Sequence, residues 1–165
     1  MGLGSFVVAH FADPEGLLPA VSLLTQRDDV VQWNAVEGNA QLIVKLRPSP
    51  PSAISDLKLA MPGTPDVTRL EILSDFTKGG ENDPSLRSAY VFIESEPRKS
   101  KDIWKFLQQS EAVQSCFSVN SGSEFIACVQ GRTFDTIDKL VNTSIRTLDG
   151  LIRLKVNRII ELRAM

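Results

Sequence analysis

The chain has 165 residues, 42% of them hydrophobic and 23% charged, a composition that is typical of a globular protein and excludes a disordered one. Its formal net charge is −2 and neither half is strongly basic, so the positive surface of a DNA-binding domain is not expected. No apolar run approaches the length of a membrane span and no signal segment is recognisable, so we expect a cytoplasmic protein with no membrane partner.

The first part of the chain predicts the element order βαββαβ. A strand over "SFVVAHF" is followed by Asp13-Pro14, where proline suits the start of a helix. A hairpin over "DVVQWNAVEGNAQLIVKL" turns at "EGN", a second helix covers "SPPSAISDLKLAM", and "DVTRLEIL" is the last strand. The apolar stripe of the first helix consists of Leu17, Leu18, Val21 and Leu24.

The same order returns in the second part of the chain when Phe6 is aligned with Tyr90. The strand "AYVFIES" precedes Glu96-Pro97, and a helix follows with Ile103, Phe106 and Leu107 on one face. A hairpin over "EAVQSCFSVNSGSEFIACVQ" precedes a helix with Thr133 as its N-cap, and "GLIRLKVNRIIEL" is the last strand, with Arg153 aligned to Arg69. The chain therefore reads as two ferredoxin-like units.

We expect residues 1–74 to form the first ferredoxin-like domain, 75–87 a polar linker and 88–165 the second domain. The first strand of each repeat is apolar on both faces, so one sheet face of a lone repeat would stay exposed. The fold class is therefore α+β, with the two antiparallel sheets packed face to face as a pseudo-dimer of the dimeric α+β barrel type. Further self-association to a homo-oligomer is expected.

The second repeat resembles the effector-binding domain of the Lrp/AsnC family of transcription regulators, also called the regulation-of-amino-acid-metabolism domain. The resemblance rests on the opening "AYV", the acid–proline pair, the glycine-bearing hairpin turn and "RTLDGLIR" before the last strand, and it covers residues 88–162. Residues 4–73 resemble a diverged second copy. Members of the family carry a helix-turn-helix, which we do not expect here, so the resemblance implies a stand-alone sensing or assembly module that contacts no nucleic acid directly. A further alternative is a subunit that pairs with a helix-turn-helix regulator.

The resemblance also implies a site for an amino acid or similar small-molecule effector near the hairpin loops. The family's G-D-Y-D loop corresponds to "SGSE" in the second repeat and to "GNAQ" in the first. Backbone N–H groups of the turn suit a ligand carboxylate, and Glu124 suits an ammonium group. The alternative is a solvent-exposed turn in which glycine only provides a positive φ. The predicted ligand-binding residues are Ser121, Gly122, Ser123, Glu124, Gly38 and Asn39.

The sequence offers little catalytic chemistry. It has one histidine, no motif of a nucleotide-binding loop or hydrolase, and two cysteines, Cys116 and Cys128, that are expected to be reduced although a bridge is conceivable. We therefore expect no enzyme activity, no cofactor and no metal. The alternative is a small cofactor-free or haem-type monooxygenase of the dimeric α+β barrel class, because His10, Trp33 and Asn34 resemble the His/Trp/Asn set of such enzymes.

Two surface features have structural interpretations. Trp104 lies at the edge of an apolar helix stripe, where it is expected to pack against a partner surface rather than a cofactor. Arg153 and Lys155 fall on the polar face of the last strand and indicate a solvated or salt-bridged edge.

Overall fold

The structure, a computed structural model, describes residues 3–37, 41–48, 52–61, 65–78 and 85–160. These residues form two compact units. The first holds the described residues up to 72 together with Ile160, and the second holds the described residues 73–159.

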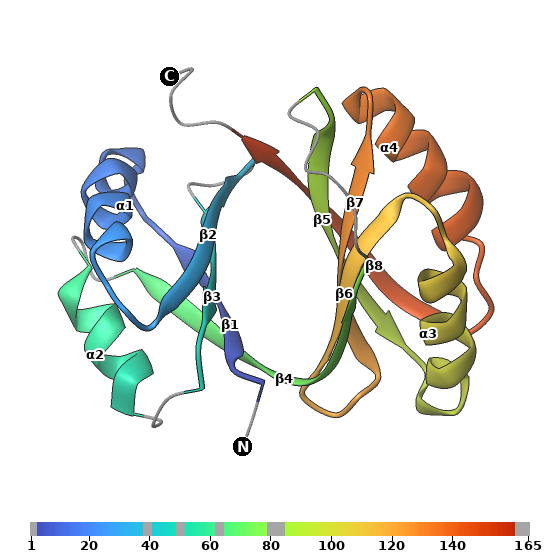
Figure 1. The fold of residues 1–165 in the computed structure, drawn as a ribbon, viewed down its shortest axis with the longest axis horizontal. Coiled ribbons are helices and arrows are strands. Elements are labelled where there is room, and N and C mark those ends of the chain that lie inside the picture. Colours follow the sequence, from blue (N-terminus) through green and yellow to red (C-terminus); the bar gives the residue numbers. More distant parts are fainter. Residues whose placement is uncertain (1–2, 38–40, 49–51, 62–64, 79–84, 161–165) are drawn as a thin grey trace. The chain divides into compact units, whose positions relative to one another are not determined.

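The first unit is an antiparallel sheet with helices on one side (Figure 1). Its elements are β1 (Ser5–His10), a 3₁₀ turn η1 (Pro14–Gly16), α1 (Leu17–Thr25), β2 (Val30–Val36), β3 (Gln41–Leu46), α2 (Ser52–Ala60) and β4 (Asp66–Thr77). Strand β1 pairs with both β3 and β4, and β2 pairs with β3, so the strand order is β4-β1-β3-β2. This is the predicted βαββαβ unit.

The second unit repeats the arrangement. Its elements are β5 (Arg87–Ser95), a 3₁₀ turn η2 (Pro97–Lys99), α3 (Ser100–Gln109), β6 (Val113–Val119), β7 (Glu124–Gly131), α4 (Phe134–Leu140), a π-helical turn η3 (Val141–Ile145) and β8 (Leu151–Ile160). Strand β5 lies between β7 and β8, and β6 pairs with β7. The predicted α+β class with two ferredoxin-like repeats is confirmed.

Each unit has its own apolar core between its sheet and its helices. In the first, Val7, Ala9 and Leu42 of the sheet pack with Leu24 and Leu57 of the helices. The predicted apolar stripe of α1 is wrong at one residue, since Leu18 is 60% exposed. The helix begins at Leu17, and its buried positions are Leu17, Ala20 and Leu24.

Helix α4 has the N-cap that the sequence predicts. The Thr133 Oγ1 accepts a hydrogen bond from the Thr136 N–H at 3.1 Å, which satisfies one of the free donors of the first turn. The core of the second unit includes Ile137 of α4, together with Ile103 and Leu107 of α3, which lie at the helix positions that the apolar spacing predicts.

Strand β4 is longer than the sequence suggests. It continues to Thr77, beyond the predicted strand 66–73, and the N–H of Lys78 donates to the Gln114 carbonyl of the second unit's sheet at 2.8 Å. Phe76 meets Trp104 edge-to-face with ring centroids 5.2 Å apart, so Trp104 packs against an apolar side chain of β4 within its own unit. The middle of the predicted linker, 79–84, lies outside the described residues.

Large apolar side chains on the sheet faces that point away from the helices are also buried. Phe6 is 1% exposed and Tyr90 is 3% exposed, while Val8 is partly buried. The first strand of each repeat therefore has buried apolar side chains on both faces, as its sequence predicts.

The register corrects the alignment of the two repeats at their last strands. Phe6 lies opposite Leu70, and Tyr90 lies opposite Asn157. If Phe6 corresponds to Tyr90, then Leu70 corresponds to Asn157, and the counterpart of Arg153 is Asp66 rather than Arg69. The reason is that the segments before the two last strands differ in length, so an alignment without a gap does not hold at the last strands.

No helix in the described part of the chain combines the length and the apolar character needed to cross a membrane.

Candidate functional site

The turn between β6 and β7 contains the predicted ligand residues Ser121, Gly122 and Ser123. The fourth predicted residue of this hairpin, Glu124, follows at the start of β7. Asn120 and Gly122 have positive φ values of 58° and 89°, and the Gly122 N–H donates to the Val119 carbonyl at 3.1 Å. Asparagine and glycine tolerate this left-handed region better than other residues, which explains their use here. The Gly122 N–H already donates a hydrogen bond within the turn. It is therefore not available to the carboxylate of a ligand, although the sequence predicted such a contact for the N–H groups of this turn.

The turn is tied to the end of β5. Ser95 is 2% exposed, and both its N–H and its hydroxyl donate to the Ser123 carbonyl, at 2.8 Å and 2.9 Å. The Ser95 hydroxyl also lies 3.1 Å from that of Ser100 at the start of α3. The Ser121 and Ser123 hydroxyls are 3.0 Å apart. This anchoring holds the turn in one position relative to the sheet.

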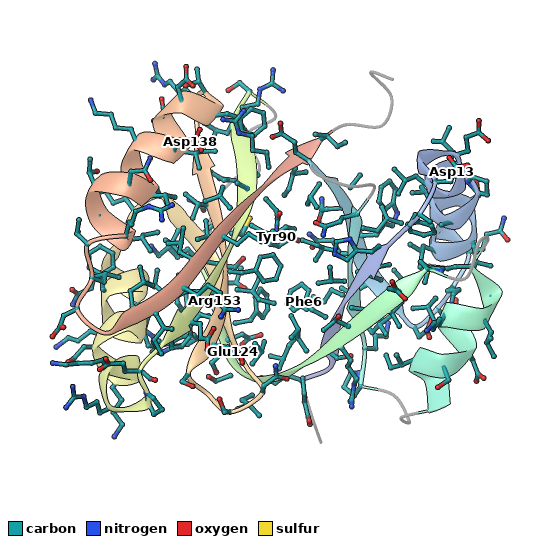
Figure 2. The ribbon with its side chains drawn as sticks, turned by 180° about the vertical axis from the view of Figure 1, so that it is seen from behind. Phe6, Asp13, Tyr90, Glu124, Asp138 and Arg153 are labelled. Atoms are coloured by element: carbon teal, nitrogen blue, oxygen red, sulfur yellow. The ribbon has the colours of Figure 1, made fainter. Side chains whose placement is uncertain are left out.

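Glu124 begins β7 and belongs to a row of charged residues across three strands. It lies directly opposite Glu94 of β5, which lies directly opposite Arg153 of β8. Residues paired in this way project to the same sheet face with Cβ atoms about 4.5–5.5 Å apart. Figure 2 shows Glu124 and Arg153 near the same end of the second unit.

The contacts within this row are weak or indirect. The Arg153 Nε lies 3.7 Å from the Glu94 Oε2, with the Arg153 side chain 80% exposed, and the Asn120 Nδ2 donates to the Glu124 Oε2 at 3.1 Å. The row therefore presents two carboxylates and one guanidinium to solvent beside the turn. The sequence predicted Glu124 as a ligand residue and placed Arg153 on the polar face of the last strand, but it did not predict Glu94. Glu94 could have been found because it follows Tyr90 and Phe92 at alternate positions of one strand and therefore shares their face.

Gly38 and Asn39, the ligand residues predicted for the first repeat, lie outside the described residues. The described end of that hairpin is Gln41, which lies opposite His10 of β1. Gln41 is 3% exposed, and its Nε2 lies 3.1 Å from the His10 Nδ1 and also contacts the Nε2.

The His10, Trp33 and Asn34 set divides between two sheet faces. Asn34 is opposite Ile43 and Ile43 is opposite Val8, so Asn34 shares the face of Val8 and His10. Trp33 packs against the core on the helix side. His10 and Asn34 are therefore the two members of this set that share a sheet face.

Cys116 and Cys128 are free thiols. Cys116 is opposite Ala127 and Cys128 is opposite Ser115, so the two sulfur atoms project to opposite sheet faces and the conceivable bridge does not form. Burial raises the pKa of the Cys116 thiol to about 12 and that of Cys128 to about 11. Within the described residues no group of three or more His, Cys, Asp and Glu side chains is placed to hold a metal ion.

The basic residues around the start of α3 are partly neutralised. Lys99 pairs with Asp149 at 2.9 Å, and Arg98 pairs with Glu96 at 3.2 Å. The hydrogen bond between Lys99 and Asp149 raises the pKa of the lysine and lowers that of the aspartate. Asp149 is exposed and Lys99 is partly exposed, so this ion pair makes only a weak contribution to stability.

The comparisons with known proteins establish the fold and leave the family open. No family model matches the chain, and no curated protein matches it. The chain is similar to the structure of the siroheme decarboxylase NirDL, with a TM-score of 0.75 and 9% identity over 95% of this chain and 71% of that one. It is also similar to a putative monooxygenase from Lactobacillus acidophilus (TM-score 0.59, 7% identity, 97% and 94% covered) and to one from Fusobacterium nucleatum (TM-score 0.57, 11% identity, 96% and 93% covered).

These matches overturn the expectation that the chain is not an enzyme. Proteins described as a decarboxylase and as monooxygenases share its fold over nearly its whole length. The scarcity of catalytic motifs was a poor guide, because short motifs identify only the chemistries that use them. Membership of the Lrp/AsnC family stays a prediction.

Proposed function

We propose that the chain binds an amino-acid-like small molecule at the hairpin end of the second unit. The observation that carries the proposal is the row of Glu124, Glu94 and Arg153 beside the anchored turn. Ionised carboxylates accept hydrogen bonds from an ammonium group, and a guanidinium donates to a carboxylate. Of the predicted residues, Glu124 belongs to this row and Ser121, Gly122 and Ser123 precede it in the turn. Gly38 and Asn39 stay a proposal for the first repeat.

The experiment is a thermal-shift screen of the full chain with amino acids and small carboxylic acids. A ligand at a hundred times its Kd stabilises the folded state by about 2.7 kcal/mol, which raises Tm by several degrees. Glu124→Gln should abolish the shift, while Glu111→Gln, which removes the same charge from an exposed position outside the row, should retain it. The absence of a shift with every compound would contradict the proposal.

A proposed biological role follows from the resemblance in sequence. A ligand-binding protein of this kind would act in the cytoplasm, form homo-oligomers and pair with a helix-turn-helix regulator. Size-exclusion chromatography with light scattering, with and without ligand, tests the oligomer, and co-purification with a tagged regulator tests the pairing.

A second candidate function is cofactor-free oxygenation, with His10 as the acid–base group. The observation that favours it is the position of His10, which is exposed at the end of β1 while the buried Gln41 amide contacts its ring. A histidine in this setting can take a proton from an electron-rich phenolic substrate, whose anion then reacts with O₂. Oxygen uptake with a panel of such substrates, lost in His10→Ala, would support this function.

A further inference from the structure

The two repeats carry different side chains at one register position on the sheet faces that point away from the helices. In the first unit Phe6 lies opposite Leu70, and in the second unit Tyr90 lies opposite Asn157. Asn157 is 5% exposed and Tyr90 is 3% exposed. The same backbone position therefore carries an apolar pair in one unit and two buried side chains with polar groups in the other.

The Asn157 side chain is buried without a hydrogen-bond partner among the described residues. Its carboxamide has two N–H donors and an acceptor oxygen. Every fully enclosed side-chain N or O atom of the described residues has a partner, so the Asn157 amide keeps some contact with solvent. A buried amide without a partner costs folding free energy, and Leu70 of the first unit shows that the fold accepts an apolar residue here.

Asn157 ends a row of hydroxyl, thiol and amide side chains across the four strands of the second unit. Tyr90 lies opposite Cys128, and Cys128 lies opposite Ser115. Burial raises the pKa of the Cys128 thiol to about 11, so the thiol stays protonated near neutral pH. Figure 2 shows Tyr90 on the side of its sheet away from α3 and α4. A ligand that bonds to Asn157 therefore meets no carboxylate, ammonium or guanidinium group in this row.

The next row along the strands supplies an aromatic surface. Phe92 lies opposite Ile126 of β7 and opposite Lys155 of β8, which is exposed. Phe92 is only partly buried, and its ring contacts no other ring of the described residues. Diagonal neighbours on one sheet face, such as Phe92 and Asn157, lie about 7–8 Å apart, which one ring system can span. The face thus offers a free amide and an aromatic ring to the same ligand.

We infer that the second unit binds an uncharged planar ring compound on this sheet face, with paired hydrogen bonds to the Asn157 amide and with Phe92 against the ring. The ring carries a donor next to an acceptor, which is the pattern that lets an asparagine pair with adenine. The ligand is uncharged because a buried charge without a partner costs far more than a buried neutral group. The first unit lacks the site because Leu70 has no polar group.

The site is separate from the one proposed at the hairpin end. Glu94, Glu124 and Arg153 lie four residues further along their strands than Tyr90, Cys128 and Asn157. Four residues of an extended strand span about 13 Å. The inference therefore goes beyond the proposed function and does not depend on it.

Isothermal titration of the full chain with 9-methyladenine, uracil and lumichrome tests the inference. All three are uncharged rings with a donor beside an acceptor. Their methylated derivatives, N6,N6,9-trimethyladenine, 1,3-dimethyluracil and 1,3-dimethyllumichrome, keep the ring and lose the donors. We expect one site per chain for at least one probe, and a loss of about tenfold in affinity for its methylated derivative, as is typical of lost hydrogen bonds.

Variants assign the two parts of the site. Asn157→Leu, which introduces the residue type of the first unit, should abolish binding and raise the Tm of the unliganded protein by about 2–4 °C. Phe92→Leu should weaken a probe and its methylated derivative alike. Gln108→Leu removes an exposed amide from α3 and is the matched control, which should retain both the binding and the Tm. The methylated series uses the unmodified protein, so it decides the matter even if a variant fails to fold.

The outcomes separate this inference from the proposed function. Equal affinity for a probe and its methylated derivative would overturn the inference, as would failure of all three probes. A lower Tm in Asn157→Leu would show that the amide is stabilising without a ligand, and would overturn it too. Each of these results leaves the hairpin site untouched, and Glu124→Gln should bind the ring probes as the unmodified protein does.

Discussion

At the scale of single residues, the two cysteines show how burial suppresses reactivity. The thiolate is the nucleophilic form, and burial raises both pKa values to about 11 or above. We predict that neither thiol of the folded protein reacts measurably with iodoacetamide at pH 8, and that both react in concentrated guanidinium chloride. Mass spectrometry of the alkylated protein measures this, and modification of Cys128 in the native state would contradict it.

Gly150 is required by both its backbone conformation and its surroundings. Its φ is +89°, and a Cβ at this position would lie 2.4 Å from the Cβ of Lys99. Gly122 has the same φ, but a Cβ there would meet only the Leu73 Cδ1, at 3.8 Å. We expect Gly122→Ala to cost about 1–2 kcal/mol of unfolding free energy from conformation alone, and Gly150→Ala to cost more.

Urea unfolding of the two glycine variants measures this difference. Equal losses of unfolding free energy in the two variants would show that Lys99 shifts away from the added Cβ at no energetic cost.

At the scale of elements, an ion pair fixes the connection between α1 and β2. The Arg27 Nε and Nη2 donate to the two Asp29 carboxylate oxygens, each at 2.9 Å, and this hydrogen bonding lowers the pKa of Asp29. A carboxyl whose pKa is depressed by folding stabilises the protein above its unfolded-state pKa, and this stability is lost as the pH falls through the folded-state value. Asp29→Asn should therefore cost about 1 kcal/mol or less at pH 7, and nothing in acid below the depressed folded-state pKa of Asp29.

The control for this variant is Asp28→Asn, which removes a neighbouring exposed charge without breaking the pair. Urea unfolding at both pH values is the measurement. A loss in Asp29→Asn that persists in acid would mean that packing, rather than the ion pair, stabilises the connection.

Elements could be predicted well where a pattern is local. The apolar spacing predicted Ile103 and Leu107 as buried, and the proline and threonine signals predicted where helices begin. The end of β4 was missed because Ser74, Asp75 and Thr77 are exposed and polar, so the segment resembles a linker. Its strand character comes from pairing and from the contact of Phe76 with Trp104, which no local pattern shows.

At the scale of the whole molecule, we predict that the two units unfold together. Strand β4 has residues in both: Asp66–Glu71 pair with β1, and Phe76 contacts Trp104 in the second unit. Unfolding of either unit should therefore disrupt this shared strand and with it the other unit.

Single-tryptophan variants can test this coupling. In Trp104→Phe, the remaining Trp33 reports the first unit, and in Trp33→Phe, Trp104 reports the second. In each variant the fluorescence midpoint in urea should coincide with the midpoint by far-UV circular dichroism, as in a two-state transition. Separate midpoints would show that the units unfold independently.

The sequence by itself determined the repeat, the βαββαβ order and most of the core, because periodicity and helix caps are properties of neighbouring residues. It also pointed to Glu124 through its place in a turn. Only the tertiary structure decided that Glu124, Glu94 and Arg153 form one row, that Gln41 contacts His10, and that the two thiols face apart. Each of these depends on the register between strands that are distant in the chain, and a shift of one residue in register would turn every side chain to the opposite face.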